Sequence, residues 1–359
     1  MRRIAGIFLA VLLIGGVVAA VVAGRENEET GTATKTVRMI IGSEKAEFFA
    51  DPDVVRALAA KGYTVRAETS GSWAMEDMDL KGYDLAFPSS QAPADELADK
   101  YGARKPLPRP FYSPLVVVTH RSTAQVLAAN GLVTLDRNQG GTLKMGAYLD
   151  AARAGRTWQQ LKGADGHTEL TGTLYVATTD PQTSNSGALY LAAASYVANG
   201  DRVVTDDAGL DRTAPLMRRL VQVQGAQKSS SDATFRDFTS GVGEPLVLVY
   251  ESQIAALLRE GEDAVGDLVV LYPDITATSD HTVVPLTESG RALGELLTAD
   301  PELRRLAVRH GFRPQGASAE FTRATEAHTA YLNQRLTGVR QAPVPTSEVL
   351  REMARRARG

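Results

Sequence analysis

The sequence predicts an α/β protein with two Rossmann-like lobes, each on a mixed, mostly parallel sheet, joined by a hinge of two crossings and preceded by an apolar N-terminal helix. Short β-branched strands alternate with helices, which is typical of a parallel sheet. Loops rich in hydroxyls and glycine follow three of these strands in succession. The chain has 359 residues, more than one core of about 100 to 200 residues usually serves, so two lobes are expected.

The N-terminal segment predicts export. Two arginines precede the uncharged, mostly apolar residues 4–23, and by the positive-inside rule this places the N-terminus in the cytoplasm and the body outside. About 20 such residues suffice to span a bilayer, and the segment also ends on small residues that fit a signal-peptidase site. Residues 1–24 are therefore expected to be a signal peptide or a membrane anchor, and both stay open. Residues 25–36 are expected to form a polar linker.

Composition excludes several classes of function. The chain has no cysteine, which rules out disulfides, thiolate metal sites, a cysteine nucleophile and a lipid-modified N-terminal cysteine. A formal net charge of −3 leaves no basic surplus to attract phosphate backbones, so no nucleic-acid partner is expected. With 43% hydrophobic residues, the body has the composition of a folded protein.

Residues 37–114 are expected to begin the first lobe, and further strands and helices are expected near the end of the chain. A helix follows its first strand because Asp51 can cap a helix that carries Pro52 at its first position. The strands expected here are 37–41, 64–68 and 84–87, with a short helix over 75–80, a return strand over 283–286 and helices over 288–298 and 301–311.

Loops rich in serine and glycine leave the carboxyl ends of the first three strands. These ends share one edge of a parallel sheet, and ligands bind at that edge. Lys45 is the only cation on the loops. The residues of this lobe expected to bind ligand are Ser43, Lys45, Ser70, Gly71, Ser72, Ser89 and Ser90.

Residues 115–272 are expected to form the second lobe. The proline-rich stretch 107–114 and the apolar strand 115–119 predict a crossing into it. The further strands expected are 174–177, 245–250 and 268–271, and the helices are 188–197 and 251–258. Residues 341–359 are expected to form a basic helix or tail with a solvated face.

The loop ahead of helix 188–197 is the most informative segment. Ser184, Asn185 or Ser186 can cap that helix, whose first backbone N–H groups then face the crevice and favour an accepting or anionic ligand group. Glu251 begins the next helix, where it can satisfy the helix dipole or bind ligand. The residues of this lobe expected to bind ligand are Thr179, Ser184, Asn185, Ser186, Gly187 and Glu251.

The order of elements resembles the type II periplasmic-binding-protein family, the solute receptors of bacterial ABC importers, and in particular its oxyanion receptors. The resemblance spans residues 37–316 and is carried by the hydroxyl-rich loops, residues 179–187, the strand end 249–252 and the tail 269–314. It implies two α/β lobes joined by two crossings, with the first lobe built from both ends of the chain, residues 37–114 together with 273–340. A solute is then trapped by hinge closure and passed to an ABC permease.

Two features depart from the family pattern. The lipid-attachment cysteine is missing. Glu44, Asp180 and Glu251 lie near predicted ligand loops, which fits a zwitterionic, cationic or metal-linked ligand better than a simple oxyanion.

The sequence thus predicts an extracytoplasmic receptor, membrane-anchored or secreted, that binds a small polar solute without catalysis or cofactor. One alternative is a membrane-anchored sensing or assembly protein with the same fold. A second is a secreted serine hydrolase with Ser70, Ser72 or Ser186 as nucleophile, but nothing local supplies the histidine and acid it needs. The motifs of zinc proteases, α/β-hydrolases and P-loop proteins are absent from the sequence.

Overall fold

The computed structural model describes residues 34–136, 139–261 and 265–359. The predicted apolar segment 4–23 and the predicted linker, except for its last three residues, lie outside this part of the chain. Within the described ranges, no helix is both long and apolar enough to cross a bilayer.

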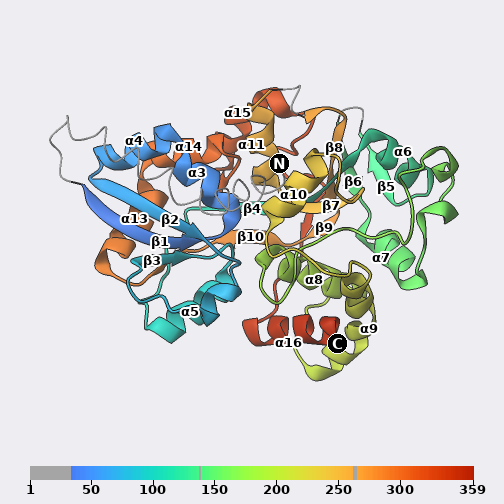
Figure 1. The fold of residues 1–359 in the computed structure, drawn as a ribbon, viewed down its shortest axis with the longest axis horizontal. Helices are drawn as coiled ribbons and strands as arrows, with labels where there is room; N and C mark the ends of the chain where they lie inside the picture. Colours follow the sequence, from blue (N-terminus) through green and yellow to red (C-terminus); the bar gives the residue numbers. More distant parts are fainter. Residues whose placement is uncertain (1–33, 137–138, 262–264) are drawn as a thin grey trace, which may run out of the picture.

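The first lobe is an α/β layer built on a four-stranded sheet. Its strands are β1 (Lys35–Ile41), β2 (Tyr63–Thr69), β3 (Leu85–Phe87) and β11 (Val284–Pro285). Strand β1 is parallel to β2 and β3, while β11 is antiparallel to β3. The helices here are α3 (Ala46–Ala50), α4 (Pro52–Ala60), α5 (Gln91–Tyr101), α13 (Glu288–Ala299) and α14 (Pro301–Arg309), with 3-10 turns η2 (Ser43–Lys45) and η3 (Ala74–Asp77). Blue and orange segments lie together in Figure 1, so distant parts of the chain build this lobe.

The local signals predicted these elements well. Asp51 caps α4 as expected, because its carboxylate accepts a hydrogen bond from the Asp53 backbone N–H at 2.7 Å. The helix predicted over 75–80 is shorter, a single 3-10 turn over Ala74–Asp77.

The second lobe holds the larger sheet. Its strands are β4 (Phe111–His120), β5 (Val133–Leu135), β6 (Gly140–Leu143), β7 (Val247–Tyr250) and β8 (Leu268–Pro273). The helices are α6 (Arg121–Ala129), α7 (Met145–Ala154), α8 (Asn185–Ala198), α9 (Asp207–Gln222), α10 (Ser231–Thr239) and α11 (Glu251–Arg259). Strand β6 is parallel to β8, whereas β4 is antiparallel to both β7 and β8.

The long strand β4 links the lobes. Its first half pairs with β10 (Thr278–His281) and β12 (Arg313–Pro314), which return to the first lobe. Its second half pairs with β7 and β8 inside the second lobe. Two connections between the lobes therefore run side by side, one through β4 and the other from β8 to β10. The mixed α/β, two-lobed fold class is confirmed, whereas the apolar N-terminal helix lies outside the described residues.

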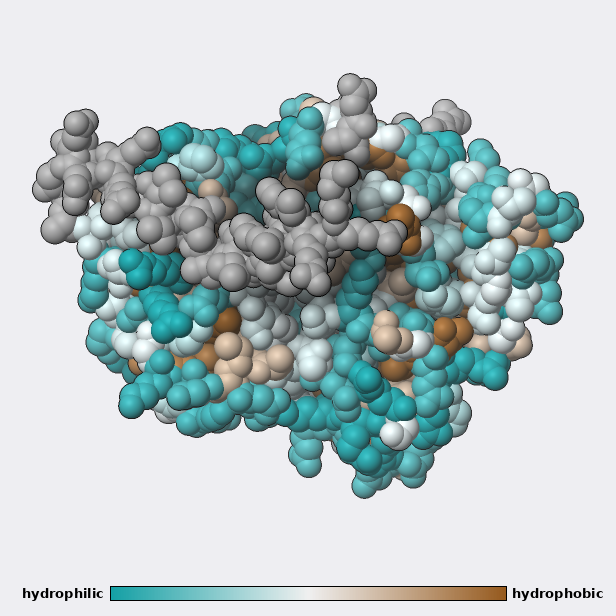
Figure 2. Space-filling view, viewed as in Figure 1, coloured by the Kyte–Doolittle hydropathy of each residue, from teal (hydrophilic) through white to brown (hydrophobic). Residues whose placement is uncertain are grey.

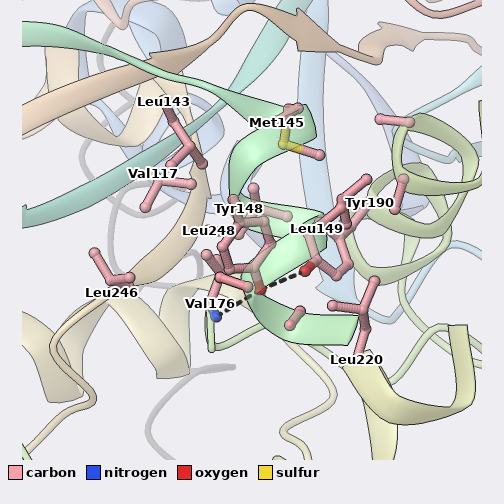
Figure 3. Close-up of a cluster of buried hydrophobic side chains, with 14 of the residues drawn as sticks. Val117, Leu143, Met145, Tyr148, Leu149, Val176, Tyr190, Leu220, Leu246 and Leu248 are labelled. Carbon is pink, nitrogen blue, oxygen red and sulfur yellow. Dashed lines mark hydrogen bonds between the residues drawn. The ribbon is translucent and has the colours of Figure 1, made fainter. Parts of the chain in front are cut away.

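A hydrophobic core holds the second lobe together and fixes the approach to the site. Figure 3 shows the Tyr148 hydroxyl of α7 accepting a hydrogen bond from the Val176 backbone N–H at 3.0 Å. The same hydroxyl lies 2.8 Å from the Tyr190 hydroxyl of α8. The Val176 N–H therefore donates to a side chain and not to a neighbouring strand. Residues 174–177 form no strand, and only Ala177 makes an isolated β-bridge, to Val247. The strand predicted there is therefore wrong.

The chain between α14 and the C-terminal helix contacts the second lobe, although the sequence analysis grouped it with the first. Phe321 of α15 (Ser318–Ala324) and Leu332 lie in one apolar cluster with Val249 and Tyr272. Strand β13 (Arg340–Gln341) pairs with β9 (Ile275–Thr276). These late residues thus pack against strands β7 and β8 of the second lobe and pair with β9, which follows β8.

The C-terminal helix α16 (Ser347–Arg358) touches both lobes, beside α5, α8 and α9 (Figure 1). Leu350 lies in an apolar cluster with Trp73 of the first lobe and with Ala188 of α8. Arg351 pairs with Glu76 of the first lobe, and Arg356 pairs with Asp207 and Asp211 of α9. Figure 2 shows a hydrophilic surface over α9 and α16, in keeping with these ion pairs.

Candidate functional site

A pocket lies between the lobes, at the carboxyl ends of β1, β2 and β3. It encloses about 10 Å³, room for about one water molecule, so the lobes are closed on each other. Serines dominate its wall. The lining residues are Gly42, Ser43, Glu44, Ser70, Gly71, Ser72, Ser89, Ser184, Asn185, Ser229, Ser230, Ser231 and Tyr250.

The lobes meet beside the pocket through backbone groups. The Thr183 carbonyl of the second lobe accepts hydrogen bonds from the backbone N–H groups of Trp73 and Ala74, each at 3.2 Å. A Cβ atom on Gly71 would lie 2.3 Å from the same carbonyl oxygen, so only glycine permits this approach. Ser90 donates to the Asn185 side-chain oxygen at 2.5 Å, which adds a side-chain bond across the cleft.

Lys45 lies beneath the pocket and does not line it. Its ammonium group is fully buried and donates to Glu44 Oε1 (2.5 Å), Ser89 Oγ (3.2 Å) and His281 Nδ1 (3.0 Å). These three bonds use all three of its donors. The sequence analysis expected Lys45 to bind ligand, but its neighbours consume its hydrogen-bonding capacity.

His281 completes this network as a neutral ring. Burial and the Lys45 charge lower the pKa of His281 to about 4. With Nδ1 accepting from Lys45, the Nε2–H faces the Ser279 hydroxyl at 3.4 Å, and Ser279 donates to the Ser89 carbonyl. The ring therefore serves as an acceptor for the lysine at neutral pH.

Glu44 presents one carboxylate oxygen to this network and keeps the other free. Oε1 accepts from Lys45 and from the Ser89 hydroxyl at 2.6 Å. No residue in the described ranges donates to Oε2, although the side chain is only 4% exposed and the residue lines the pocket. Burial has the largest single effect and raises the pKa of Glu44, but the charge of Lys45, the neighbouring His281 and the hydrogen bond from Lys45 together lower that pKa well below its usual range. The pocket thus holds an ionised carboxylate with one unused oxygen.

Asp232 of α10 faces Glu44 from the second lobe. It accepts hydrogen bonds from the Ser43 hydroxyl across the cleft and from the Gln253 side chain, the latter at 2.6 Å. Burial and the Glu44 charge raise the pKa of Asp232 to about 6, and exposed Glu47 adds to the rise. Asp232 is therefore a titrating group that links the two lobes.

The loop before α8 is organised by Thr179. Ser184 is the N-cap residue of α8, but its side chain makes no capping bond. Instead, the Thr179 hydroxyl accepts from the Gly187 backbone N–H at 2.9 Å and lies 2.8 Å from the Ser186 hydroxyl. Ser184 thus occupies the N-cap position as predicted, but the capping hydrogen bond comes from Thr179, eight residues before Gly187.

Glu251 lies away from the pocket in a closed ion pair. Arg313 donates to both of its oxygens, through Nε at 2.6 Å and Nη2 at 2.8 Å, and the Tyr272 hydroxyl donates as well. Arg313 also donates to the carbonyls of Asn333 and Gln334. The Glu251 carboxylate is fully buried and occupied, which leaves no oxygen for a solute.

The structure brings together about half of the residues expected at the site. Those that line the pocket are Ser43, Ser70, Gly71, Ser72, Ser89, Ser184 and Asn185. Those that stand outside its wall are Lys45, Ser90, Thr179, Ser186, Gly187 and Glu251. The sequence analysis missed Ser229–Ser231, Tyr250 and Asp232. The triple serine followed by an acid, before an amphipathic helix, was the available signal.

The structure shows no catalytic serine partnership at the serines proposed for a hydrolase. In the part of the chain that the structure describes, Ser70, Ser72 and Ser186 have no histidine partner. Ser279 lies beside His281, but it is fully buried and donates to a backbone carbonyl. Over the same described residues, no group of three or more metal-ligating side chains converges.

Solved structures with the same fold are substrate-binding proteins. The sulfate-binding protein SubI from Mycobacterium tuberculosis is 17% identical, with a TM-score of 0.55 over 88% of this chain and 96% of its own. A periplasmic thiamin-binding protein is 12% identical, with a TM-score of 0.59 over 91% and 97%. The substrate-binding protein of an ABC transporter from Agrobacterium tumefaciens is 15% identical, with a TM-score of 0.56 over 92% and 96%.

These likenesses show the fold, that of the two-lobed periplasmic binding proteins, over most of the chain. No protein-family model and no curated protein matches the sequence.

Proposed function

We propose that this chain is a non-catalytic solute-binding receptor of an ABC importer. The observation that carries the proposal is the pocket to which both lobes contribute: the serine-rich loops after β1, β2 and β3 meet Ser184, Asn185 and Ser229–Ser231 there. A solute held at such a place contacts both lobes only when they close, which couples binding to a change of shape. The solved structures of like fold are binding proteins, one of them from an ABC transporter, which supports the proposal.

Export of the receptor is part of the proposal and rests on the sequence. Residues 4–23 are expected to carry the body out of the cytoplasm, as a cleaved signal or as an anchor. The partner proposed for the closed receptor is an ABC permease in the same membrane.

The hydrogen-bonding groups of the pocket support a small polar solute as ligand. The wall offers hydroxyls from both lobes, the Asn185 amide, and backbone N–H groups of Ser43, Gly71 and Ser72 that donate to no described residue. Such a wall replaces the water around a polar solute by fixed donors and acceptors. Because the pocket as it stands holds about one water molecule, a larger solute must bind with the lobes further apart than they are here.

Calorimetric titration of the purified full chain tests the proposal. The titrants are amines, amino acids, sugars, inorganic oxyanions and divalent cations, and small-angle scattering follows the radius of gyration. At least one class is expected to bind with a measurable heat and to make the particle more compact. Absence of binding across all five classes would contradict the receptor function.

A further inference from the structure

The ionisable groups around the pocket set the charge of the ligand, on the premise that the proposed receptor function holds. No lysine, arginine or histidine lines the wall in the described ranges, and Lys45 lies beneath it with every donor occupied. Glu44 and Lys45 cancel, His281 is neutral, and Asp232 carries a negative charge above its pKa of about 6. The surroundings are therefore neutral or negative, and they disfavour a ligand that carries only negative charge.

The unpartnered oxygen of Glu44 indicates which chemical group the ligand presents to the pocket. The Glu251 carboxylate, which lies outside the pocket, has both oxygens occupied by donors from Arg313 and Tyr272. Glu44 Oε2 has no such partner in the described chain, and its ionised state is secured by Lys45 on the other oxygen. A donor from the ligand satisfies it, and a charged N–H donor satisfies it best.

Unused backbone donors of the first lobe face the same space. Gly71 and Ser72 line the pocket, and their N–H groups donate to no residue among those described. Such groups favour an accepting oxygen on the ligand. A small molecule with an ammonium group and a nearby oxygen meets both requirements at once.

We infer that the pocket recognises a small solute bearing an ammonium group, which binds the free oxygen of Glu44 while an oxygen of the solute accepts from the N–H groups of Gly71 and Ser72. Asp232 favours the same positive group from the opposite lobe without contacting it. Lys45 acts as a positioning residue, because it holds Glu44 ionised and aimed at the pocket. The ligand class is thus amino alcohols and amino acids of the smallest size.

The test is a calorimetric titration of the full chain with two sets of probes. The first set is ethanolamine and glycine; the second is acetate, phosphate and sulfate. We expect binding from the first set and none from the second. Binding by the second set alone would overturn the ligand class and leave the receptor function standing, whereas silence of both sets and of the wider panel would remove both.

Variants of Glu44 make the test specific to its carboxylate. Glu44→Gln is expected to weaken binding of the first set at least tenfold, because it replaces the anionic acceptor by an amide. Glu44→Asp keeps the charge for Lys45 but draws it back from the pocket, so it also weakens binding while preserving the ion pair. The matched control is Glu47→Gln, an exposed acid three residues along the chain, which should leave affinity within twofold. Unchanged affinity in both folded Glu44 variants would overturn the inference.

Discussion

Two carboxylates with buried side chains each pair with a buried cation. Glu44 in the first lobe pairs with Lys45, and Glu251 in the second lobe pairs with Arg313. Glu251 has both oxygens bound, by Arg313 and Tyr272, and lies outside the pocket. Glu44 lines the pocket and has one oxygen bound, by Lys45 and Ser89, while its other oxygen accepts from no residue among those described. We infer that the Glu251–Arg313 pair is structural, because both carboxylate oxygens are occupied. The Glu44–Lys45 pair leaves one carboxylate oxygen available to a ligand.

The largest loss of stability is expected when the Glu251–Arg313 pair is broken. Arg313→Met leaves Glu251 buried without its base, so the free energy of unfolding should fall by about 3 to 5 kcal/mol. Urea denaturation at neutral pH measures this loss. Solute affinity of the folded protein should change little, since neither residue lines the pocket.

A surface ion pair provides the control for that variant. Arg340 pairs with Asp201, and the two side chains are 63% and 41% exposed. Arg340→Met should cost less than about 1 kcal/mol. Equal losses for the two arginine variants would contradict the structural role assigned to Arg313.

Breaking the Glu44–Lys45 pair should lower the free energy of unfolding less than breaking Glu251–Arg313 does, but it should lower solute affinity more. Lys45→Met removes the charge beside Glu44, whose pKa then rises, but Glu44 keeps an oxygen at the pocket where water can reach it. A loss of roughly 1 to 3 kcal/mol in unfolding free energy is expected. Affinity for an ammonium-bearing solute should fall as well, measured by calorimetry on the same preparation. A stability loss larger than that of Arg313→Met would reverse the ranking of the two pairs.

Gly71→Ala tests whether the region around Glu44 moves while that around Glu251 does not. The added Cβ would lie 2.3 Å from the Thr183 carbonyl oxygen, so the lobes cannot close fully. Solute affinity should fall at least tenfold, about 1.4 kcal/mol, with little change in the denaturation midpoint. Gly146→Ala is the matched control, because its Cβ meets nothing within 4 Å. Full closure of Gly71→Ala by small-angle scattering would disprove the steric argument.

The smallest effect is expected from the pH dependence of closure. The pKa of Asp232 is raised from its usual 3.8 to about 6 in the closed form, so this form holds a proton that an exposed aspartate releases. Closure should therefore be favoured below pH 6 and weaken as pH rises through 6, by on the order of 1 kcal/mol without solute. Scattering from pH 5 to 7.5 measures it.

Asp232→Asn should abolish this dependence, since the amide does not titrate. The groups that face Asp232 are Ser43, Glu44, Glu47 and Gln253, and Glu44 stays ionised throughout that range. Asp237→Asn, on the same helix and paired with Lys228, serves as the control. A pH dependence that survives in Asp232→Asn would assign it to another group.

Local signals were enough to predict most of the fold. The β-branched run before Gly42 became β1, and Asp51 with Pro52 began α4. Residues 174–177 failed because a distant hydroxyl, that of Tyr148, took the N–H that a strand would use. Strand propensity depends on residues that are neighbours in the sequence, so it cannot predict a hydrogen bond from a side chain far along the chain.

The pocket residues that the sequence predicted correctly are those that directly follow a strand. Ser43, Ser70, Gly71 and Ser72 follow β1 and β2 and line the pocket. Glu251 also follows a strand, but its base lies 62 residues further along the chain, and no local rule connects the two. Ser229–Ser231 follow no strand, so a rule based on strand ends passed over them.

Calorimetric titrations with ethanolamine or glycine should be run on the full chain and on its Gly71→Ala variant. We expect binding to the unaltered chain and at least a tenfold loss in the variant, because the solute must contact both lobes at once. Equal affinities for the two proteins would place the ligand elsewhere and contradict the central claim.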